Sequence, residues 1–531
     1  MQLFPPARLL LLGAIGLSGC VQLGPDFHTP ALPWVEHWNS QALADASQRQ
    51  PQPDLKQWWK VFADPALERL IAEADAHNSS LKIAGLRVIE ARAQLGVAQS
   101  GRYPQLQQAR AESFYLDRDQ SGGTRPLDSS AWQHSAGIDV GWELDFWGRF
   151  SRAIESADDS YFAAEANYQD VLILLRAQMA ETYFALRTSE ARLRIARDNA
   201  EQQKRSYEIT EKLFSSGQNA ELDLQQAKTQ YLGTLSTIPE FESQVHRTRN
   251  ALATLIGRPP GPLPELSEKT GLIPLIDRAI LQDIPANLLL RRPDIRAAEL
   301  NAAAQSARIG VAETDLYPSL TLLGSIGWSA SSLDGSSRSL DLGAGPSLSW
   351  NIFDQGRLTN NVRVQDARLQ QLIETYRDAV RQAAREADDA ANGLTSALQR
   401  EQILRQSALS AQRSMTLASA QYREGYSDFQ RVLDAQRALL QQQDSYLVSR
   451  SNAVSSLIAL YKALGGGWYS SQPLLDQATR EQMQQRTDWG DLLGPSIDDQ
   501  QTTQPLKSDL LAQPADKAAK PAAAAQVKIN D

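Results

Sequence analysis

The stretch Ile-Glu-Ala-Arg-Ala-Gln-Leu-Gly-Val-Ala at residues 89–98 returns at residues 303–312 as Ala-Ala-Gln-Ser-Ala-Arg-Ile-Gly-Val-Ala. A Tyr-Pro pair follows each copy, at Tyr103-Pro104 and at Tyr317-Pro318, with the same spacing of 214 residues. Two amphipathic helices that resemble each other by chance would not be followed by the same landmark at the same distance. The sequence therefore contains one unit twice.

The two copies stay aligned far beyond this stretch. After a deletion of six residues in the second copy, the spacing becomes 208 residues, from Trp142 to Trp350, and it is unchanged at Gly257 and Gly465. A period of this length is far above the ~20–50 residues of solenoid repeats. The sequence predicts one fold built from two similar halves.

Each half contains stretches in which apolar and polar residues alternate. Alternation with period two, over the ~9–11 residues of a membrane strand, is typical of a wall with one face in lipid and one in water. A half-buried sheet of a soluble protein alternates as well. Pro346 lies inside one stretch, although proline is usually confined to strand edges or bulges. The stretches are residues 136–146, 320–329 and 340–352, with a weaker one at 106–116, whose expected apolar face Arg110 and Glu112 interrupt.

Turn-forming residues at 121–126 and 334–337 separate these stretches into two hairpins, and so into four strands per chain. Four strands cannot close a membrane barrel, and an open sheet edge in hydrocarbon leaves its hydrogen bonds unmade. A chain that spans the membrane must therefore oligomerise. Two copies supply about 8 strands, whose interior is filled by side chains, whereas three supply about 12 and leave a lumen, so three or more copies are favoured.

The helical stretches are unusually long. Residues 149–216 contain neither Gly nor Pro, and residues 357–424 contain only Gly393. At ~1.5 Å per residue, each stretch reaches about 100 Å as a helix. Such sustained helices usually belong to coiled-coil-like assemblies.

Both long stretches end at a glycine, Gly217 or Gly425, which predicts a helix C-cap and a hairpin turn. A second helix is expected after each turn. Asp428 is a candidate N-cap for the later one, and Pro239 should kink the earlier one. These second helices are expected at residues 220–257 and 428–465.

The first residues have the pattern of an export signal. The apolar stretch Leu9–Leu17 is too short to span a bilayer, and Ser18-Gly19-Cys20 follows it. Small residues before a cysteine resemble a bacterial lipoprotein cleavage site, which implies N-palmitoyl and S-diacylglycerol groups on Cys20. The alternative is an ordinary signal peptide with an incidental cysteine. Val21 follows, rather than the aspartate that retains such lipoproteins in the inner membrane, so the outer membrane is implied.

Composition excludes several classes of function. Mean hydropathy is −0.39, and no long apolar run follows the signal, so the sequence predicts no transmembrane helix. A net charge of −9 provides no basic stripe for nucleic acid. The single cysteine excludes a disulfide framework, and the five histidines are not at ligand spacing on any predicted helix. We expect no enzyme, no metal site and no cofactor other than the covalent lipid.

Several motifs together resemble one known family. They are Trp58-Trp59, residues 290–295 (Leu-Arg-Arg-Pro-Asp-Ile), residues 317–320, residues 433–437 (Leu-Asp-Ala-Gln-Arg) and residues 461–468. The chain resembles the lipoprotein (OprM/NodT-type) branch of the TolC-like outer membrane factors, the exit ducts of tripartite efflux pumps. Each motif alone is weak, but together they are specific, and the resemblance covers about residues 20 to 468.

The resemblance implies a mixed α/β membrane protein with an internally duplicated protomer. Three protomers would form a β-barrel of about 12 strands in the outer membrane, continued by an α-barrel of about 12 helices through the periplasm. The expected segments are the signal peptide 1–19, a lipidated and equatorial segment 20–64, the first repeat 65–258, an equatorial linker 259–285, the second repeat 286–465, a C-terminal equatorial segment 466–498 and a disordered tail 499–531.

The implied function is a passive, homotrimeric conduit that exports drugs or other small toxic compounds. Its implied partners are outer membrane lipid, a periplasmic adaptor and an inner-membrane pump of the resistance–nodulation–division class. The adaptor should contact the hairpin tips at Gly217 and Gly425. Two alternatives remain: a type I protein-secretion duct, and a lipoprotein scaffold of coiled-coil helices that does not span the membrane.

The family has its constriction on the helix just after the second hairpin turn. Asp434 matches the acidic position of that constriction, and its counterpart in the first half is Gln226. One turn earlier this branch has an apolar residue, but here the position is Gln430, which shares a helix face with Asp434. Three Asp434 carboxylates near the axis would repel one another, attract cations, or pair with Arg431 or Arg437. These four residues are the predicted periplasmic gate.

Overall fold

The computed structural model describes residues 21–32, 55–118, 129–266, 273–276, 291–331, 337–469 and 472–494. Cys20, the strand loops at 121–126 and 334–336, and the tail 499–531 lie outside these residues. The chain divides into two compact units, Met1–Asp476 and Gln477–Asp531, which are described separately.

The first unit repeats one order of elements. In each half a helix is followed by a β-hairpin, a helix of 67 residues and a helix of 35 residues. The predicted duplication is therefore visible element by element. The first half contains α4 (Ser79–Ser100), β1 (Leu106–Arg118), β2 (Ser129–Glu143), α5 (Arg149–Ser215) and α6 (Glu221–Leu255), and the second contains α7 (Pro293–Thr314), β3 (Ser319–Ser331), β4 (Ser337–Ser349), α8 (Arg357–Arg423) and α9 (Phe429–Ala463). The short elements η2 (Trp58–Phe62), α3 (Pro65–His77) and η3 (Pro264–Leu266) lie outside this repeated order.

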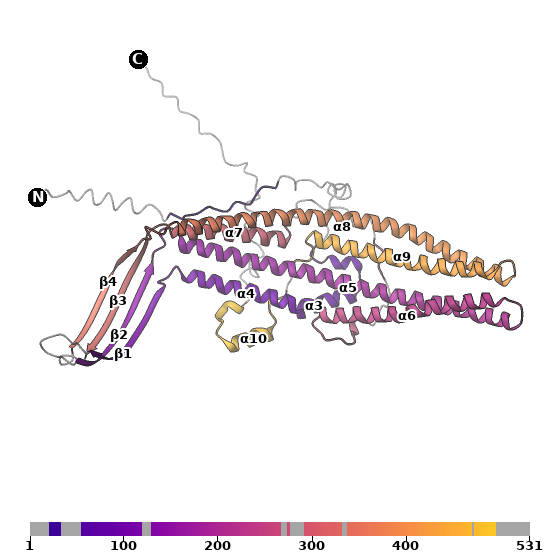
Figure 1. Cartoon of the computed structure of the whole chain (residues 1–531), viewed down its shortest axis with the longest axis horizontal. Helices are drawn as coiled ribbons and strands as arrows, with labels where there is room; N and C mark the ends of the chain where they lie inside the picture. The colour runs from indigo at the N-terminus through magenta and orange to yellow at the C-terminus, as the bar shows by residue number, and fades with distance from the viewer. Residues whose placement is uncertain are drawn as a thin grey trace, which may run out of the picture. The chain divides into compact units, whose positions relative to one another are not determined.

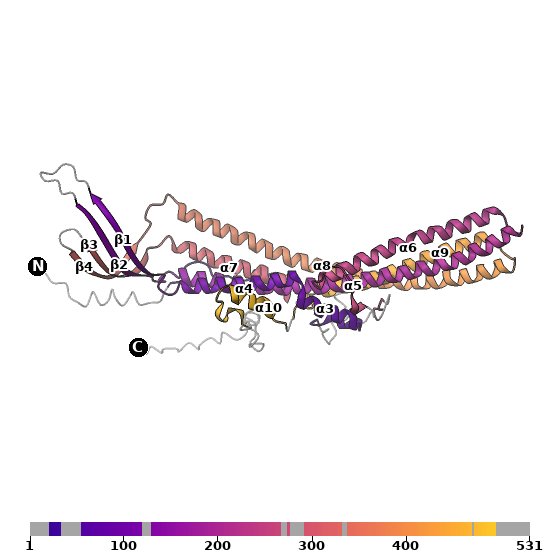
Figure 2. The same cartoon turned by 90° about the horizontal axis from the view of Figure 1, so that it is seen from below.

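The helices of the first unit lie side by side. α5 packs against α4, α6, α7 and α9, and α8 packs against α7 and α9. Figures 1 and 2 show the β-sheet beyond one end of these helices, and the turns that join α5 to α6 and α8 to α9 at the other. The sheet and the two hairpin turns are thus separated by the length of the long helices.

Four glycines end the four long helices in the same way. Gly217, Gly257, Gly425 and Gly465 have φ between 71° and 75°, the left-handed region. At the first of them, the Gln218 N–H donates to the Leu213 carbonyl at 2.8 Å, and equivalent bonds follow the other three. This is the Schellman motif, in which glycine avoids the strain that a side chain would impose. The predicted C-caps are confirmed.

The start of α9 and the course of α6 also follow from local sequence. The Asp428 carboxylate accepts a hydrogen bond from the Arg431 N–H and caps α9, as predicted. Pro239, which we expect to kink the helix, lies inside α6 without ending it. The helix continues to Leu255.

The four strands form one antiparallel sheet in the order β1-β2-β3-β4. The register places Ile138 opposite Ile326, and Ile326 opposite Leu342. Because side chains alternate between faces along a strand, the apolar residues of β2, β3 and β4 share one face. Their neighbours Asp139 and Ser325 share the other. The predicted four strands and their alternation are confirmed.

The prediction for the apolar face of β1 is wrong. Arg110 is opposite Gly137 in the register, so its side chain lies on the polar face of the sheet. There its Nη2 atom lies 2.8 Å from Oδ2 of Asp139. Ala109 and Tyr115 belong to the apolar face instead. Arg110 and Glu112 therefore do not interrupt the apolar face, because the pattern of β1 is shifted by one residue from that expected.

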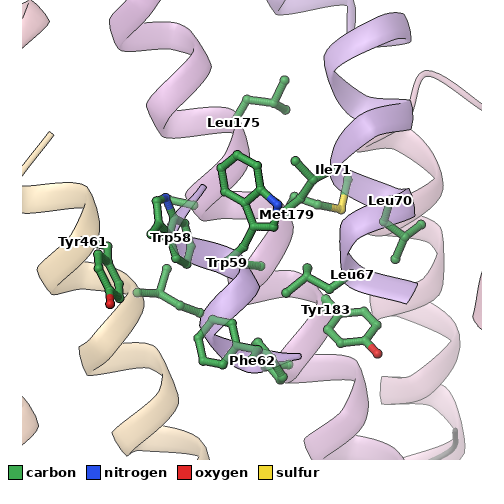
Figure 3. Packing of buried hydrophobic residues seen from close by; sticks show 14 of the residues in the cluster. Trp58, Trp59, Phe62, Leu67, Leu70, Ile71, Leu175, Met179, Tyr183 and Tyr461 are labelled. Carbon is green, nitrogen blue, oxygen red and sulfur yellow. The ribbon is translucent and has the colours of Figure 1, made fainter. Parts of the chain in front are cut away.

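The core is organised around the Trp58-Trp59 motif (Figure 3). The Trp58 ring stacks on Tyr461 of α9 at 5.3 Å, and Phe62 contacts the edge of Phe184 on α5 at 4.7 Å. Burial of these large rings stabilises the fold by removing apolar surface from water. The segment before the first repeat is therefore held between α5 of one half and α9 of the other.

Arg176 of α5 crosses this core. Its Nη2 atom lies 2.6 Å from Oδ2 of Asp75, and its Nη1 atom donates to the carbonyls of Gly467 and Tyr469, both at 2.7 Å. The guanidinium also lies 4.9 Å from the centre of the Trp59 ring. Burial raises the pKa of the Asp75 carboxyl, and Arg176 opposes that rise. One buried cation thus joins three separate segments.

The first and last helices of each half are joined differently in the two halves. In the first half, the Asn78 side chain donates to the Leu255 carbonyl at the end of α6, at 2.9 Å. The counterpart of Asn78 is Arg292, which donates to the Ala463 carbonyl at the end of α9, also at 2.9 Å. Arg292 in addition pairs with Asp294 and Glu386. The contact between the start of α7 and the end of α9 therefore includes ion pairs, whereas the contact between the start of α4 and the end of α6 is a neutral hydrogen bond.

An acid lies beside these ion pairs. Burial, then the negative charge of Asp294, raises the pKa of Asp170 to about 6, while Arg292 opposes the rise. Asp170 therefore binds a proton at a higher pH in the folded chain than a free aspartate does, although it is still mostly ionised at neutral pH. Its protonation at mildly acidic pH removes its repulsion of Asp294.

No helix in the described part of the chain is both long and apolar enough to cross a membrane. The second unit contains the helix α10 (Gln477–Arg486) and the short turn of helix η6 (Gly490–Leu493).

Candidate functional site

One face of the sheet is apolar and open. Ile138, Ile326 and Leu342 have exposed fractions of 52%, 43% and 74%. A contiguous exposed apolar surface marks contact with a membrane or another protein, because water disfavours it. Four adjoining strands present such a face here.

Aromatic residues flank this face at both ends. At the end near the helices, the Trp142 indole donates to the Arg102 carbonyl at 3.2 Å, and the Trp350 indole, just past β4, to the Leu316 carbonyl at 3.0 Å. Towards the other end, Tyr115 packs on Trp132 at 5.6 Å. Trp328 shares the apolar face. Aromatic girdles of this kind occupy the two interfaces of a membrane wall.

Over β3 and β4 the opposite face of the sheet is mostly small and polar, while Leu323 of β3 and Leu106, Phe114 and Leu116 of β1 share this face. It carries the Arg110–Asp139 ion pair and a series of serines and glycines on β3 and β4, namely Ser325, Gly327, Ser329, Ser339, Gly343, Gly345 and Ser347. Such residues suit contact with water rather than lipid. The sheet has the two-sided character of a wall between lipid and an aqueous lumen.

Both edges of the sheet are open in the described chain. β1 is hydrogen-bonded only to β2, and β4 only to β3. An edge in a membrane must be paired, because hydrocarbon offers its N–H and C=O groups no partner. Pro346 lies in the edge strand β4, which is the position that tolerates proline in a single chain. The wall is complete only when sheets of several copies join edge to edge.

The two hairpin turns lie at the far end of the helices. The Asn219 side chain, after the first turn, donates to the Tyr422 hydroxyl, before the second, at 2.8 Å. A Cβ placed on Gly217 or Gly425 would meet nothing within 4 Å. The two predicted tips are therefore joined to each other and open to an incoming partner.

Three of the four predicted gate residues, Gln430, Asp434 and Arg437, lie together near the second turn. The Gln430 amide donates to Oδ1 of Asp434 at 3.1 Å, and Nη1 of Arg437 lies 3.6 Å from the same oxygen. The Asp434 side chain is 61% exposed, while Leu433 beside it is buried. Asp434 therefore projects away from the packed helices with two partners of its own.

Arg431 does not join this group. Its Nε atom lies 4.0 Å from Asp428, and both side chains are 72% exposed. Of the two cations predicted to pair with Asp434, the structure places Arg437 beside it. Arg437 also donates to the Gln230 amide of α6 at 2.9 Å. Asp434 is thus linked through Arg437 to Gln230 of the first helical hairpin.

A polar ladder between α5 and α9 was not predicted from the sequence. From the turns inward its steps are Ser206 with Gln436 at 2.9 Å, Asn199 with Gln443 at 3.1 Å, Arg192 with Asp444 at 2.7 Å, and Thr188 with Ser451 at 2.8 Å. Three α5 members recur every seven residues, as do two pairs on α9. That spacing places them along one helix face. A heptad of polar residues inside two long helices is the signal that could have found this ladder.

Comparison with known proteins agrees with this geometry. The family model described as "Outer membrane efflux protein" matches residues 70–258 and 284–466. The chain is similar to the probable outer membrane lipoprotein SilC of Salmonella typhimurium, with 30% identity over 85% of this chain and 96% of that protein. It is also similar to the toluene efflux pump outer membrane protein TtgI of Pseudomonas putida, with 33% identity over 88% of this chain and 98% of that protein.

Solved structures give the same result. The outer-membrane channel OprN superposes with a TM-score of 0.77 at 33% identity, over 84% of this chain and 99% of that chain. The structure of CusC superposes with a TM-score of 0.71 at 29% identity, over 84% of this chain and the whole of that chain. The predicted resemblance, fold class and efflux function are confirmed, and of the three functions considered these relatives support the efflux conduit.

Proposed function

This chain belongs to the outer membrane efflux protein family, and from that membership we propose how its own residues anchor and close the channel. It is the outer membrane channel subunit of an efflux system, works as a homotrimer, and pairs with a periplasmic adaptor and an inner-membrane pump. The observation that carries this function is the sheet, which is apolar on one face, polar on the other and unpaired at both edges.

We propose that the channel is a passive conduit for drugs or other small toxic compounds, driven by a pump of the resistance–nodulation–division class. Relatives are named for different cargoes, among them toluene, pyoverdine and cations. Proteins with one architecture and different cargoes support a duct that does not itself select the compound. The test is the susceptibility of cells that lack the gene to a panel of toxic compounds. Unchanged susceptibility to every compound, with the pump and adaptor present, would contradict the proposal.

The proposed repeat boundaries, 65–258 and 286–465, are supported by the two segments that the family model matches. The equatorial assignment of residues 20–64, 259–285 and 466–498 remains part of the proposal. It is supported by the contact of Trp58 with Tyr461 near the end of α9 and by that of the Gly467 carbonyl with Arg176 in the middle part of α5.

We propose that Cys20 carries the lipid anchor, supported by the lipoprotein name of one relative. Replacing Cys20 with serine should abolish acyl labelling and processing by the lipoprotein route, because the thiol that receives the diacylglycerol is gone. Efflux should survive in part if another peptidase releases the signal, since the sheet also holds the trimer in the membrane. Metabolic labelling with a radioactive fatty acid measures the change, and labelling of Cys20→Ser at the wild-type level would refute the assignment.

We propose that Asp434 lines the periplasmic constriction with Gln430 and Arg437. Its exposure on the free protomer supports this, because a lumen-facing carboxylate must be reachable by ions. Asp434→Ala should raise single-channel conductance and lower cation selectivity in planar bilayers, because three negative charges leave the narrowest part of the pathway.

The matched control is Asp388→Ala on α8, whose carboxylate accepts a bond from Asn392 one turn away on the same helix. It removes the same charge at a position where the barrel is expected to be wide, so conductance should change little. Conductance and selectivity that stay at wild-type values in Asp434→Ala would place this residue outside the gate.

A further inference from the structure

The residues that directly follow Cys20 form an extended strap against the helices. The strap comprises residues 21–32 and contacts both α5 and α7. The Leu23 N–H donates to the Trp147 carbonyl at 3.1 Å, and the Ser306 hydroxyl of α7 donates to the Pro25 carbonyl at 3.1 Å. The chain is therefore fixed within a few residues of the lipidation site.

Arg152 of α5 holds the strap. Its Nε atom donates to the Leu23 carbonyl at 2.9 Å, and its Nη2 atom donates to the Gly24 carbonyl at 3.1 Å and to Asp26 at 2.8 Å. The Arg152 side chain is only 3% exposed. A buried guanidinium is tolerated only when its donors and charge have partners. Within the described residues, the hydrogen-bond partners of this cation are Glu155 on its own helix and three groups of the strap.

The strap also crosses α7 at a contact that admits no side chain. A Cβ on Gly24 would lie 2.4 Å from the Cα atom of Gly310. A Cβ on Gly310 would lie 2.6 Å from the Leu23 carbonyl oxygen. Gly310 is inside a helix, where glycine is disfavoured, and the close approach of the strap leaves no room there for any side chain.

The duplication supplies an internal control for both residues. The counterpart of Gly310 in the first half is Gly96, at which a Cβ would meet nothing within 4 Å. The counterpart of Arg152 in the second half is Asn360, whose side chain accepts a bond from Arg363 of its own helix at 3.1 Å. Among the described residues, neither counterpart contacts an extended segment such as the strap. Arg152 and the sterically crowded Gly310 both lie where the strap contacts the helices.

We propose that Arg152 and Gly310 form a dedicated seat that fixes the depth of the lipid anchor relative to the membrane-facing sheet. Gln22 packs on Gly148, where a Cβ would lie 2.8 Å from the Gln22 Cγ atom. Gly148 is the N-cap of α5, just after β2. Cys20 is two residues away, a reach of at most ~7 Å. Its acyl chains therefore enter the leaflet at the level where the sheet passes into the helices.

The seat is tested first by hydrogen exchange on the purified full-length trimer. Arg152→Asn gives the residue that the duplication carries at the equivalent place, and it should speed exchange of the amides in residues 21–32 at least tenfold. Asn360→Ala is the matched control and should leave those amides at the wild-type rate. Wild-type protection of residues 21–32 in Arg152→Asn would overturn the seat.

A glycine pair gives a second test that does not depend on removing a charge. Gly310→Ala should release the strap, because the new methyl group overlaps the Leu23 carbonyl. Gly96→Ala adds the same methyl group at the same position of the other half and should leave residues 21–32 protected. Equal protection in the two alanine variants would contradict the assignment of Gly310.

The proposed positioning of the lipid anchor rests on the proposed lipidation of Cys20. One experiment distinguishes the positioning role from the lipidation itself. Because the only natural thiol is used by the lipid, a fluorophore on Gln22→Cys labels one site. Quenching by lipids that carry nitroxides at different depths should give one interfacial depth, and Arg152→Asn should broaden that distribution. The same depth distribution in both proteins would refute the positioning role. Absent acyl labelling of the wild-type protein would instead refute lipidation and leave the exchange results intact.

Discussion

Replacing Ile326 with arginine is expected to prevent formation of the membrane-inserted trimer. The side chain lies on the apolar face, opposite Ile138 and Leu342, and is open to the surroundings of the sheet. An arginine on the lipid face near the bilayer midplane costs ~2–4 kcal/mol, and a trimer carries this cost three times. The yield of heat-resistant trimer, measured in outer membrane fractions, should fall to near zero. Leu348→Arg, on the same face of β4, should also lower the yield of heat-resistant trimer.

The control for this prediction is the next residue in the same strand. Ser325 lies opposite Asp139 and Gly343, on the polar face. Ser325→Arg introduces the same charge and the same bulk, but into the aqueous side of the wall, and trimer yield should stay close to wild type. Ser347→Arg provides the same control for β4. Equal tolerance of arginine on both faces would show that the two faces of the sheet have been assigned wrongly.

Replacing Arg176 with alanine is expected to be the most destabilising single change in the helical body. The substitution leaves the buried Asp75 carboxylate without its cation and removes the donor to the carbonyls of Gly467 and Tyr469. Loss of one partner of a buried pair costs ~3–5 kcal/mol, because the remaining charge is neither solvated nor paired. Thermal unfolding of the detergent-solubilised protein, followed by circular dichroism, should begin at a clearly lower temperature.

Asp75→Asn is the informative comparison for this change. The amide keeps the shape of the carboxylate, and Arg176 keeps its two carbonyl acceptors, so the loss should be smaller than in Arg176→Ala. Arg192→Ala, in a pair whose two side chains are each about one-third exposed, should cost less again. An Arg176→Ala protein that unfolds at the wild-type temperature would show that this cation does not join the three segments.

Local patterns were sufficient to predict the elements of the first unit. The ends of α5 and α8 were predictable because Gly217 and Gly425 supply a left-handed residue where each helix must stop. The strands were predictable because alternation over β2, β3 and β4 is carried by each strand on its own. Four strands and an open edge required more than one copy, and the family resemblance then implied the trimeric fold class.

The face of β1 was not predictable in this way. Its sequence is mixed, and the side to which Arg110 points is decided by pairing with β2, which brings it to Asp139. Cross-strand partners are a property of register rather than of one strand. The error was therefore one of register and not of element type.

The long-range contacts of Arg176 and Arg152 could not be predicted from local pattern. Arg176 binds the Gly467 carbonyl, and Arg152 binds the Leu23 carbonyl, across separations of 291 and 129 residues. Backbone carbonyls accept hydrogen bonds whatever the residue type, so the sequence at the acceptor carries no signal. For the gate, proximity along one helix was enough to predict that Gln430, Asp434 and Arg437 lie together, but not the link from Arg437 to Gln230.

The most direct test of a trimeric membrane channel is conductance of the purified full-length protein in planar lipid bilayers. Discrete conductance steps should appear with the heat-resistant trimer and disappear when heating converts it to monomer, because the four strands of one chain cannot close a wall. The same trimer prepared with Ile326→Arg should give no steps, and with Ser325→Arg should conduct. A folded, heat-resistant trimer that inserts into the bilayer and shows no conductance, even after Asp434→Ala, would contradict a channel formed by this sheet.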